Sequence, residues 1–133
     1  GARALLSTRE LPDTIFDVLA IRPAVLLTHG EQLRAALAAH FRALTYLRQN
    51  PWDSAYRIAT HLEISAEELI TSLRGMELPD LIGNQRYLSA QDGDLQRVTK
   101  KLSAIMRQAG IIRQPVNFNE LYSGAYLPAT PAS

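Results

Sequence analysis

Apolar side chains fill the segment from Ile15 to Ile21, where Asp17 is the one charged residue. The run stops at Arg22 and Pro23. A short apolar run that ends in turn residues is typical of a strand buried on both faces. We therefore expect a strand in this segment, and such a strand needs a neighbour at each edge.

From Thr28 onward the apolar positions recur at helical spacing. Thr28 can cap a helix, and Glu31 stands where its carboxylate can complete a capping box. One stripe carries the apolar side chains Leu33, Leu37, Phe41, Leu44 and Leu47. The pattern predicts a helix that begins at Thr28, covers an apolar surface and ends near Gln49.

Two shorter helices are predicted next. Asn50 and Pro51 supply a cap and a first-turn proline for a helix that runs to Leu62. Ser65 and Glu68 form a second capping box, which opens another helix. Leu69, Ile70 and Leu73 are predicted to point inward from this helix, and Gly75 is predicted to end it.

The remaining chain alternates between irregular and helical patterns. Residues 77–91 contain Pro79, Gly83 and Asn84, and we expect an irregular connection there. Helical spacing returns from Leu95, and Gly110 stands where a left-handed helix end is expected. Asn117 and Glu120 repeat the capping spacing, which predicts a short last helix through Leu121 and Tyr122.

Composition indicates a folded chain of one domain. It has 133 residues, of which 47% are hydrophobic and 20% charged, as in ordinary globular proteins. Its 14 basic and 13 acidic residues leave a net charge of +1, which is too small to attract a polyanion over long range. We therefore expect no nucleic-acid partner. The absence of cysteine excludes disulfides and thiolate metal sites.

No catalytic pattern stands out. His29, His40 and His61 lie too far apart in the sequence to share a metal at helical spacing. Neither a Gly-x-Ser-x-Gly turn nor a glycine-rich phosphate loop occurs. Glu67 and Glu68 are explained by the helix dipole at a helix start. We expect no enzyme activity, no metal site and no cofactor.

One alternative is a DNA-binding helix-turn-helix. The spacing of apolar and small residues from Tyr56 to Met76 fits such a unit. However, Glu63 holds the turn position usually given to glycine, and Glu67 and Glu68 would face the DNA phosphates. The regulator therefore stays a second hypothesis.

Several segments together carry a resemblance to a known family. They are residues 1–12, residues 15–22, the helix predicted from Thr28 to Gln49 with the Gln49-Asn50-Pro51 break at its end, residues 55–62, the helix start at Ile64–Glu68, Pro79-Asp80-Leu81 and residues 109–112. In this order they resemble the C-terminal portion of the periplasmic solute-binding proteins of ABC importers, in the family for aliphatic sulfonates, taurine and nitrate. The resemblance covers roughly nine tenths of the chain as an order of elements, and no single sharp motif carries it.

The resemblance implies an α/β, mostly helical chain that is part of a type II periplasmic-binding-protein fold with few strands. Residues 1–27 would be the end of the second lobe and the strand that returns to the first lobe. Residues 28–127 would be the helical C-terminal part, and residues 128–133 a tail. Two departures are an unusually apolar Arg22–Leu27 and the absence of most of the first lobe. We expect the chain to begin partway into a larger fold.

The implied function is capture of a small anionic or zwitterionic organic solute, such as a sulfonate, for an ABC permease in the membrane. The protein would be periplasmic or otherwise extracytoplasmic. The resemblance places Phe16 and Asp17 near the cleft between the two lobes, so they are the first candidates for ligand binding. Thr8 and Arg9 are the second candidates. A sensory domain of the same fold is a third hypothesis. Because the strand from Ile15 to Ile21 has few partners in this chain, we expect a homodimer through it or a marginally folded monomer.

Overall fold

The computed structural model describes residues 3, 5, 15–89, 93–118 and 121–129. These described residues form helices and contain no strand. The helices are α1 (Pro23–Gln49), α2 (Pro51–Leu62), α3 (Ala66–Leu73), α4 (Leu81–Tyr87) and α5 (Asp94–Gln108). A mostly helical chain was predicted and is confirmed, whereas the sheet of an α/β fold is not seen in these residues.

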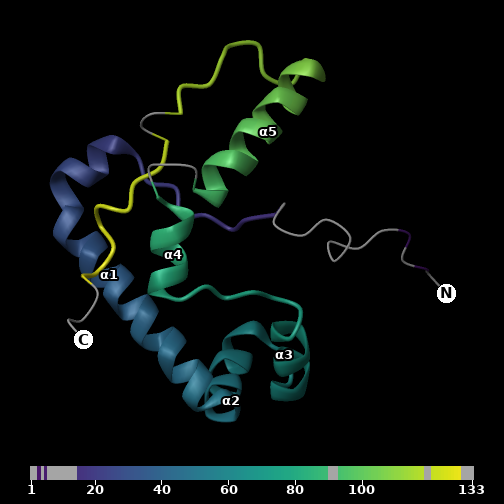
Figure 1. Cartoon of the computed structure of the whole chain (residues 1–133). Helices are drawn as coiled ribbons and strands as arrows, with labels where there is room; N and C mark the ends of the chain where they lie inside the picture. Colours follow the sequence, from purple (N-terminus) through teal and green to yellow (C-terminus); the bar gives the residue numbers. More distant parts are fainter. Residues whose placement is uncertain (1–2, 4, 6–14, 90–92, 119–120, 130–133) are drawn as a thin grey trace.

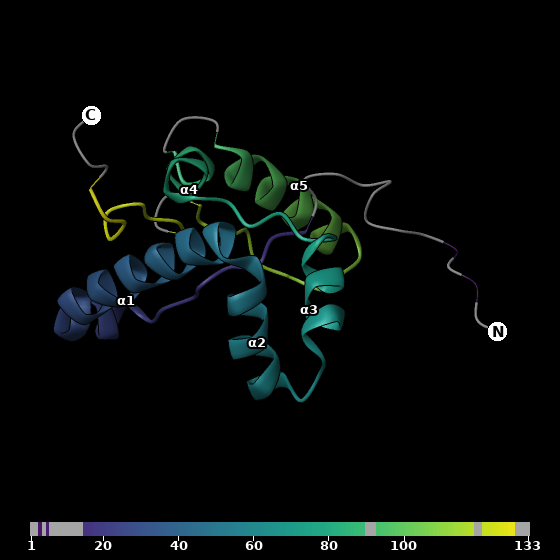
Figure 2. The same ribbon diagram turned by 90° about the horizontal axis from the view of Figure 1, so that it is seen from below.

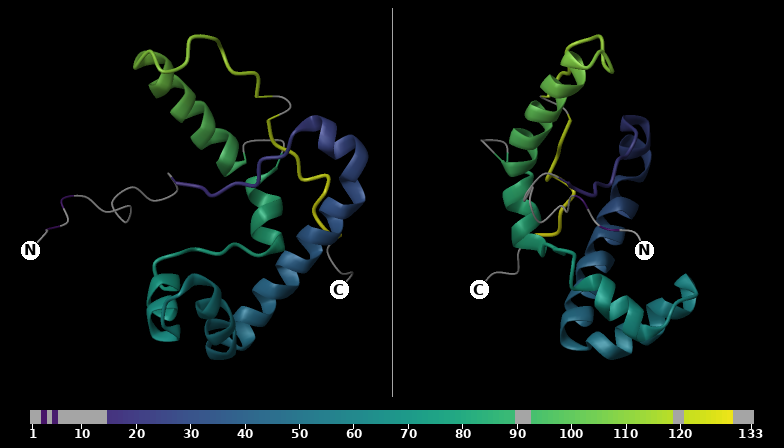
Figure 3. Two further views of the ribbon diagram at one scale, coloured as in Figure 1. Left: turned by 180° about the vertical axis from the view of Figure 1, so that it is seen from behind. Right: turned by 90° about the vertical axis from the view of Figure 1, so that its right-hand side faces the viewer.

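The helices form an open arrangement around α1 (Figure 1). The α2–α3 pair lies at the C-terminal end of α1, and the views from below and from behind keep it there (Figures 2 and 3). α4 lies between α1 and α5, and α5 lies at the opposite end of the molecule from α2 and α3 (Figures 1 and 3). α2 packs on α1 and α3, and α5 packs on α4. No helix in the described part of the chain is long and apolar enough to span a bilayer.

The prediction of a strand from Ile15 to Ile21 is wrong, because the structure has no strand at these residues. The segment runs as irregular backbone without a ladder partner among the described residues. Its apolar side chains are not buried on both faces, because Ile15 is 71% and Leu19 70% exposed. A strand needs partners for its backbone N–H and C=O groups, and sequence pattern alone cannot supply them.

The predicted start of the first helix at Thr28 is also wrong. α1 begins at Pro23, whose fixed φ suits the first helical position. The Thr28 hydroxyl donates back to the carbonyl of Ala24 at 3.2 Å instead of capping forward. A kink follows at His29, which has φ −129° and ψ 24°. The capping pattern at Thr28 therefore marks a break within a helix and not the start of one.

The α2–α3 pair contains the best-packed cluster among the described residues. It is formed by the buried side chains Ala55, Ala59, Ala66 and Leu69, with Ile70 and Leu73 packed against them. Small residues let the two helices approach closely. The predicted Ser65–Glu68 capping box is confirmed: Glu68 N donates to Ser65 Oγ at 3.1 Å, and Ser65 N donates to Glu68 Oε2 at 2.8 Å.

Glu63 turns the chain between α2 and α3 in the left-handed conformation, with φ 56° and ψ 36°. This conformation brings the Cβ of a non-glycine residue too close to its own backbone. Glu63→Gly should therefore stabilise the chain by about 1 kcal/mol in a urea denaturation experiment. The same change at Glu67, inside α3, should destabilise it by up to about 1 kcal/mol. Equal effects at both positions would contradict the left-handed turn.

The predicted irregular connection over residues 77–91 contains a helix. Asp80 caps α4 by accepting a hydrogen bond from Gly83 N at 2.8 Å, and Pro79 comes just before this cap. Glycine and asparagine within the helix hid it from the pattern, although Pro79-Asp80 is a recognisable start signal. α5 matches its prediction, and Gly110 has the expected left-handed φ of 72°.

The predicted last helix is wrong, since residues 121–129 form turns and irregular backbone. The predicted cap residue Glu120 lies outside the described residues. Arg34 holds this segment to α1 by donating to the carbonyl of Ala125 at 2.8 Å. Its guanidinium also lies 5.0 Å from the centre of the Tyr126 ring. This long-range contact replaces the local helix that the capping spacing predicted.

Candidate functional site

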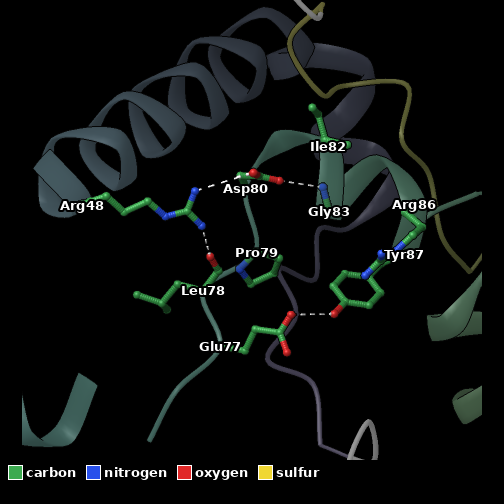
Figure 4. A pocket seen from close by; sticks show the side chains of 9 residues that line it. All are labelled: Arg48, Glu77, Leu78, Pro79, Asp80, Ile82, Gly83, Arg86 and Tyr87. Atoms are coloured by element: carbon green, nitrogen blue, oxygen red, sulfur yellow. Dashed lines mark hydrogen bonds and ion pairs between the residues drawn. The ribbon is translucent and has the colours of Figure 1, made fainter. Parts of the chain in front are cut away.

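A hollow lies between the C-terminal end of α1, the segment before α4, and α4 itself (Figure 4). We call it the central hollow. Its lining residues are Arg48, Glu77, Leu78, Pro79, Asp80, Ile82, Gly83, Arg86 and Tyr87. Four of the nine lining residues are charged, so guanidinium and carboxylate groups meet a phenol and apolar side chains in one concave surface.

Arg48 ties α1 to the start of α4. Its Nη2 donates to the carbonyl of Leu78 at 2.6 Å, and its Nη1 lies 3.6 Å from Asp80 Oδ2 (Figure 4). Asp80 is held in turn by the backbone N–H of Gly83. That hydrogen bond, followed by the attraction of Arg48, lowers the pKa of the Asp80 carboxyl. Arg48 and Asp80 therefore shape one wall of the hollow.

Tyr87 forms the opposite wall with Glu77 and Arg86. The phenol donates to Glu77 Oε1 at 3.2 Å, and the Arg86 guanidinium lies 5.4 Å from the ring centre. Desolvation, assisted by the Glu77 charge, raises the pKa of Tyr87, so its phenol stays protonated at neutral pH. Arg86 also lies 3.9 Å from Asp94 of α5, a loose ion pair in which Arg86 is exposed and Asp94 is half-buried. Arg86 is thus held less tightly than Arg48.

These groups are suited to binding. Arg86 can donate two parallel hydrogen bonds to a sulfonate or carboxylate, and the Glu77 carboxylate can accept from an ammonium group. His29, His40 and His61 do not line the hollow. Within the ranges described, no three His, Asp or Glu side chains are grouped so that they could hold a metal ion.

The structure places Phe16 beside the central hollow. Its ring contacts Tyr87 edge-on, with ring centres 5.4 Å apart and planes at 82°. Asp17 is exposed, and none of the described residues pairs with its carboxylate. The strand predicted from Ile15 to Ile21 would bury Asp17, and its exposure contradicts that expectation. Thr8 and Arg9 lie outside the described residues, so their predicted roles stay predictions.

Sequence reasoning missed most of the hollow. Arg48 lies in the helix that was predicted from Thr28 to Gln49, but its partners Leu78 and Asp80 belong to a segment far along the chain. Tyr87 and Glu77 were assigned to an irregular connection. The Pro79-Asp80 signal could have revealed α4 and thereby the segment that forms the hollow.

The Asp80 carboxyl gives a pH-dependent signal at the hollow. Its folded pKa lies below the ordinary value of 3.8, so its stabilising bonds are fully present above that pH and are lost as the pH falls through the folded pKa. The Gly83 amide proton, followed by NMR from about pH 5 to about pH 2, should shift with a midpoint below 3.8.

Two variants separate the causes of this shift. Asp80→Asn keeps a capping oxygen and should abolish the titration, whereas Arg48→Gln should move the midpoint only slightly, because the Gly83 N–H is the larger cause. A Gly83 midpoint at or above 3.8 would show that Asp80 does not cap α4.

The geometry of the hollow is therefore the main guide to function. Its lining includes the loosely held Arg86 guanidinium, the Glu77 carboxylate and the Tyr87 ring, and the Phe16 ring contacts Tyr87. Membership of the solute-binding family stays a prediction. Comparison of the chain with protein-family models, curated proteins and solved structures found no match.

Proposed function

We propose that the protein is a solute-binding component of an ABC importer, which captures a small anionic or zwitterionic organic molecule outside the cytoplasmic membrane and delivers it to a permease. The observation that carries this proposal is the contact of Phe16 with Tyr87. It brings the segment that the resemblance marks for ligand binding against a hollow lined by Arg86 and Glu77. The helix order from α1 to α3, with its Asn50-Pro51 break and Ser65 cap, adds support.

The charges around the hollow fit a zwitterion such as taurine. Arg86 can turn from Asp94 toward a sulfonate, because the separation of 3.9 Å and the exposure of the Arg86 side chain make a weak pair. Glu77 lines the hollow beside Tyr87, whereas Asp17 is exposed and is not among the residues that line it. The Glu77 carboxylate would attract the ammonium group, while Tyr87 would cover the methylene groups between the two charges.

Calorimetric titration with taurine, propanesulfonate and nitrate tests this proposal. Arg86→Gln should weaken binding of either sulfonate at least tenfold, because a hydrogen bond between charged groups is lost. Glu77→Gln should weaken taurine binding more than propanesulfonate binding, since propanesulfonate has no ammonium group. Arg74→Gln, an exposed change at the end of α3, is the matched control. Equal losses for Arg86→Gln and Arg74→Gln would contradict the proposed site.

The helix-turn-helix regulator remains a second candidate, favoured by the close packing of α2 on α3 and by the left-handed Glu63 between them. Charge argues against it. The first turn of α3 presents Glu67 and Glu68, and the Glu68 carboxylate is engaged with the Ser65 backbone. Gel-shift binding to duplex DNA with a steep salt dependence would favour the regulator and would remove the reason for the importer proposal.

A further inference from the structure

α5 has an apolar stripe that the described fold leaves uncovered. Its exposed members are Leu102 and Ile105, and Val98, about one turn before Leu102, is half-buried. Leu102 is 50% and Ile105 55% exposed, yet Ser103 is only 8% exposed. Ser103 lies about 100° around the helix from Leu102. Leu95, Val98 and Met106 are half-buried and Ser103 is buried, so α5 packs through a face of mixed polarity and leaves Leu102 and Ile105 exposed to solvent.

The same region concentrates positive charge. From Asp94 to Arg113 there is one acidic residue, and the basic residues are Arg97, Lys100, Lys101, Arg107 and Arg113. The whole chain has 14 basic and 13 acidic residues, so the other segments together hold 9 basic and 12 acidic ones. Asp94 pairs with Arg97 and Arg86, while Lys100 and Lys101 are exposed. The chain is thus strongly polarised despite its small net charge.

A second hollow lies at the C-terminal end of α5. Arg107 and Arg113 line it together with Ile112 and Gly110. Two guanidinium groups beside an apolar side chain suit a phosphate group that is attached to a hydrocarbon chain. This hollow extends the basic and apolar character of α5 beyond the helix itself.

We propose that α5 binds the surface of an anionic lipid membrane, with Leu102 and Ile105 inserted at the boundary between headgroups and acyl chains. Helices that combine an apolar stripe with a basic polar face, and that are too polar to cross a bilayer, bind such surfaces. The charge polarity favours this occupant over a second copy of the chain, because five of the six charged residues from Asp94 to Arg113 are basic and two copies of this segment would repel each other. α5 also lies at one end of the molecule, clear of α2 and α3 (Figures 1 and 3).

The geometry links this surface to the central hollow, because α5 packs on α4 and Asp94 meets Arg86. A membrane-bound α5 would therefore hold the hollow close to the bilayer. The inference does not depend on the identity of the solute, and its test uses no solute.

Sedimentation of the full chain with vesicles tests the inference. We expect binding to vesicles of equal parts phosphatidylglycerol and phosphatidylcholine, and little binding to phosphatidylcholine alone. Because each basic residue near an anionic surface contributes roughly a fivefold factor, Lys100→Gln with Lys101→Gln should weaken binding about twentyfold. Leu102→Ser should weaken it severalfold through loss of apolar insertion. High salt should reduce the effect of the lysines.

Matched controls lie at the other end of the molecule. Leu62→Ser in α2 and Arg74→Gln after α3 change an equally exposed leucine and an exposed cation, and both should leave vesicle binding unchanged. Circular dichroism should show the same helix content for each compared variant. Absence of binding to the anionic vesicles would overturn the inference, and so would equal losses from changes in α5 and in the controls. Self-association that is abolished by Leu102→Ser, without vesicle binding, would assign the stripe to a second copy and would also overturn it.

Discussion

Leu69→Ala should lower the free energy of unfolding by about 3 kcal/mol and separate α3 from α2. Leu69 is 6% exposed and is the largest side chain in the buried cluster of alanines that joins the two helices. Removal of its terminal carbons loses apolar burial and leaves a cavity that Ala55 and Ala59 are too small to fill. Urea denaturation followed by circular dichroism measures the loss.

Leu62→Ala is the matched control for this prediction. Leu62 lies at the end of α2 and is 55% exposed, so it loses little burial when truncated. We expect a change below about 1 kcal/mol for this variant. If Leu69→Ala and Leu62→Ala lowered the free energy of unfolding by the same amount, the packing of α2 on α3 would not be what stabilises this end of the molecule.

Ala55→Leu should destabilise the chain by about 2 kcal/mol, although leucine is a good helix former. Ala55 is 0% exposed, so there is no room for three more carbon atoms without moving α3 or straining rotamers. Ala43→Leu on the exposed face of α1 adds the same atoms in solvent and should be nearly neutral. Thermal unfolding of both variants gives the comparison, and a stabilised Ala55→Leu variant would refute close packing at this position.

Local chemistry made much of the helical structure predictable from the sequence. The Ser65–Glu68 capping box, the proline at the start of α2 and the left-handed Gly110 all depend on residues a few positions apart. Their side chains find their partners within one helical turn. These elements therefore appear where the sequence placed them.

Two of the errors, the strand and the last helix, occurred where distant partners decide the structure. Ile15 to Ile21 has strand-like composition, but no described strand pairs with it. The last segment docks on Arg34 of α1, and its capping spacing does not produce a helix. Sequence pattern gives local propensity, whereas these outcomes depend on contacts between segments far apart in the chain.

The candidate site shows the same division. Phe16 was singled out from its position in the resemblance, and its ring does lie beside the central hollow. Arg48, Glu77 and Tyr87 were not singled out, because the fold brings them together from α1, α4 and the segment before α4. Exposure of Asp17 could not be foreseen from an apolar run that predicted burial.

Uptake of labelled solute by cells tests the central claim most directly. In the organism that encodes the protein, deletion of its gene should abolish uptake of at least one solute among taurine, alkanesulfonates and nitrate. A wild-type copy should restore this uptake, and a copy with Arg86→Gln should restore it poorly, while Arg74→Gln restores it fully. Unchanged uptake of all three kinds of solute after deletion would contradict the proposal that this chain captures them for import.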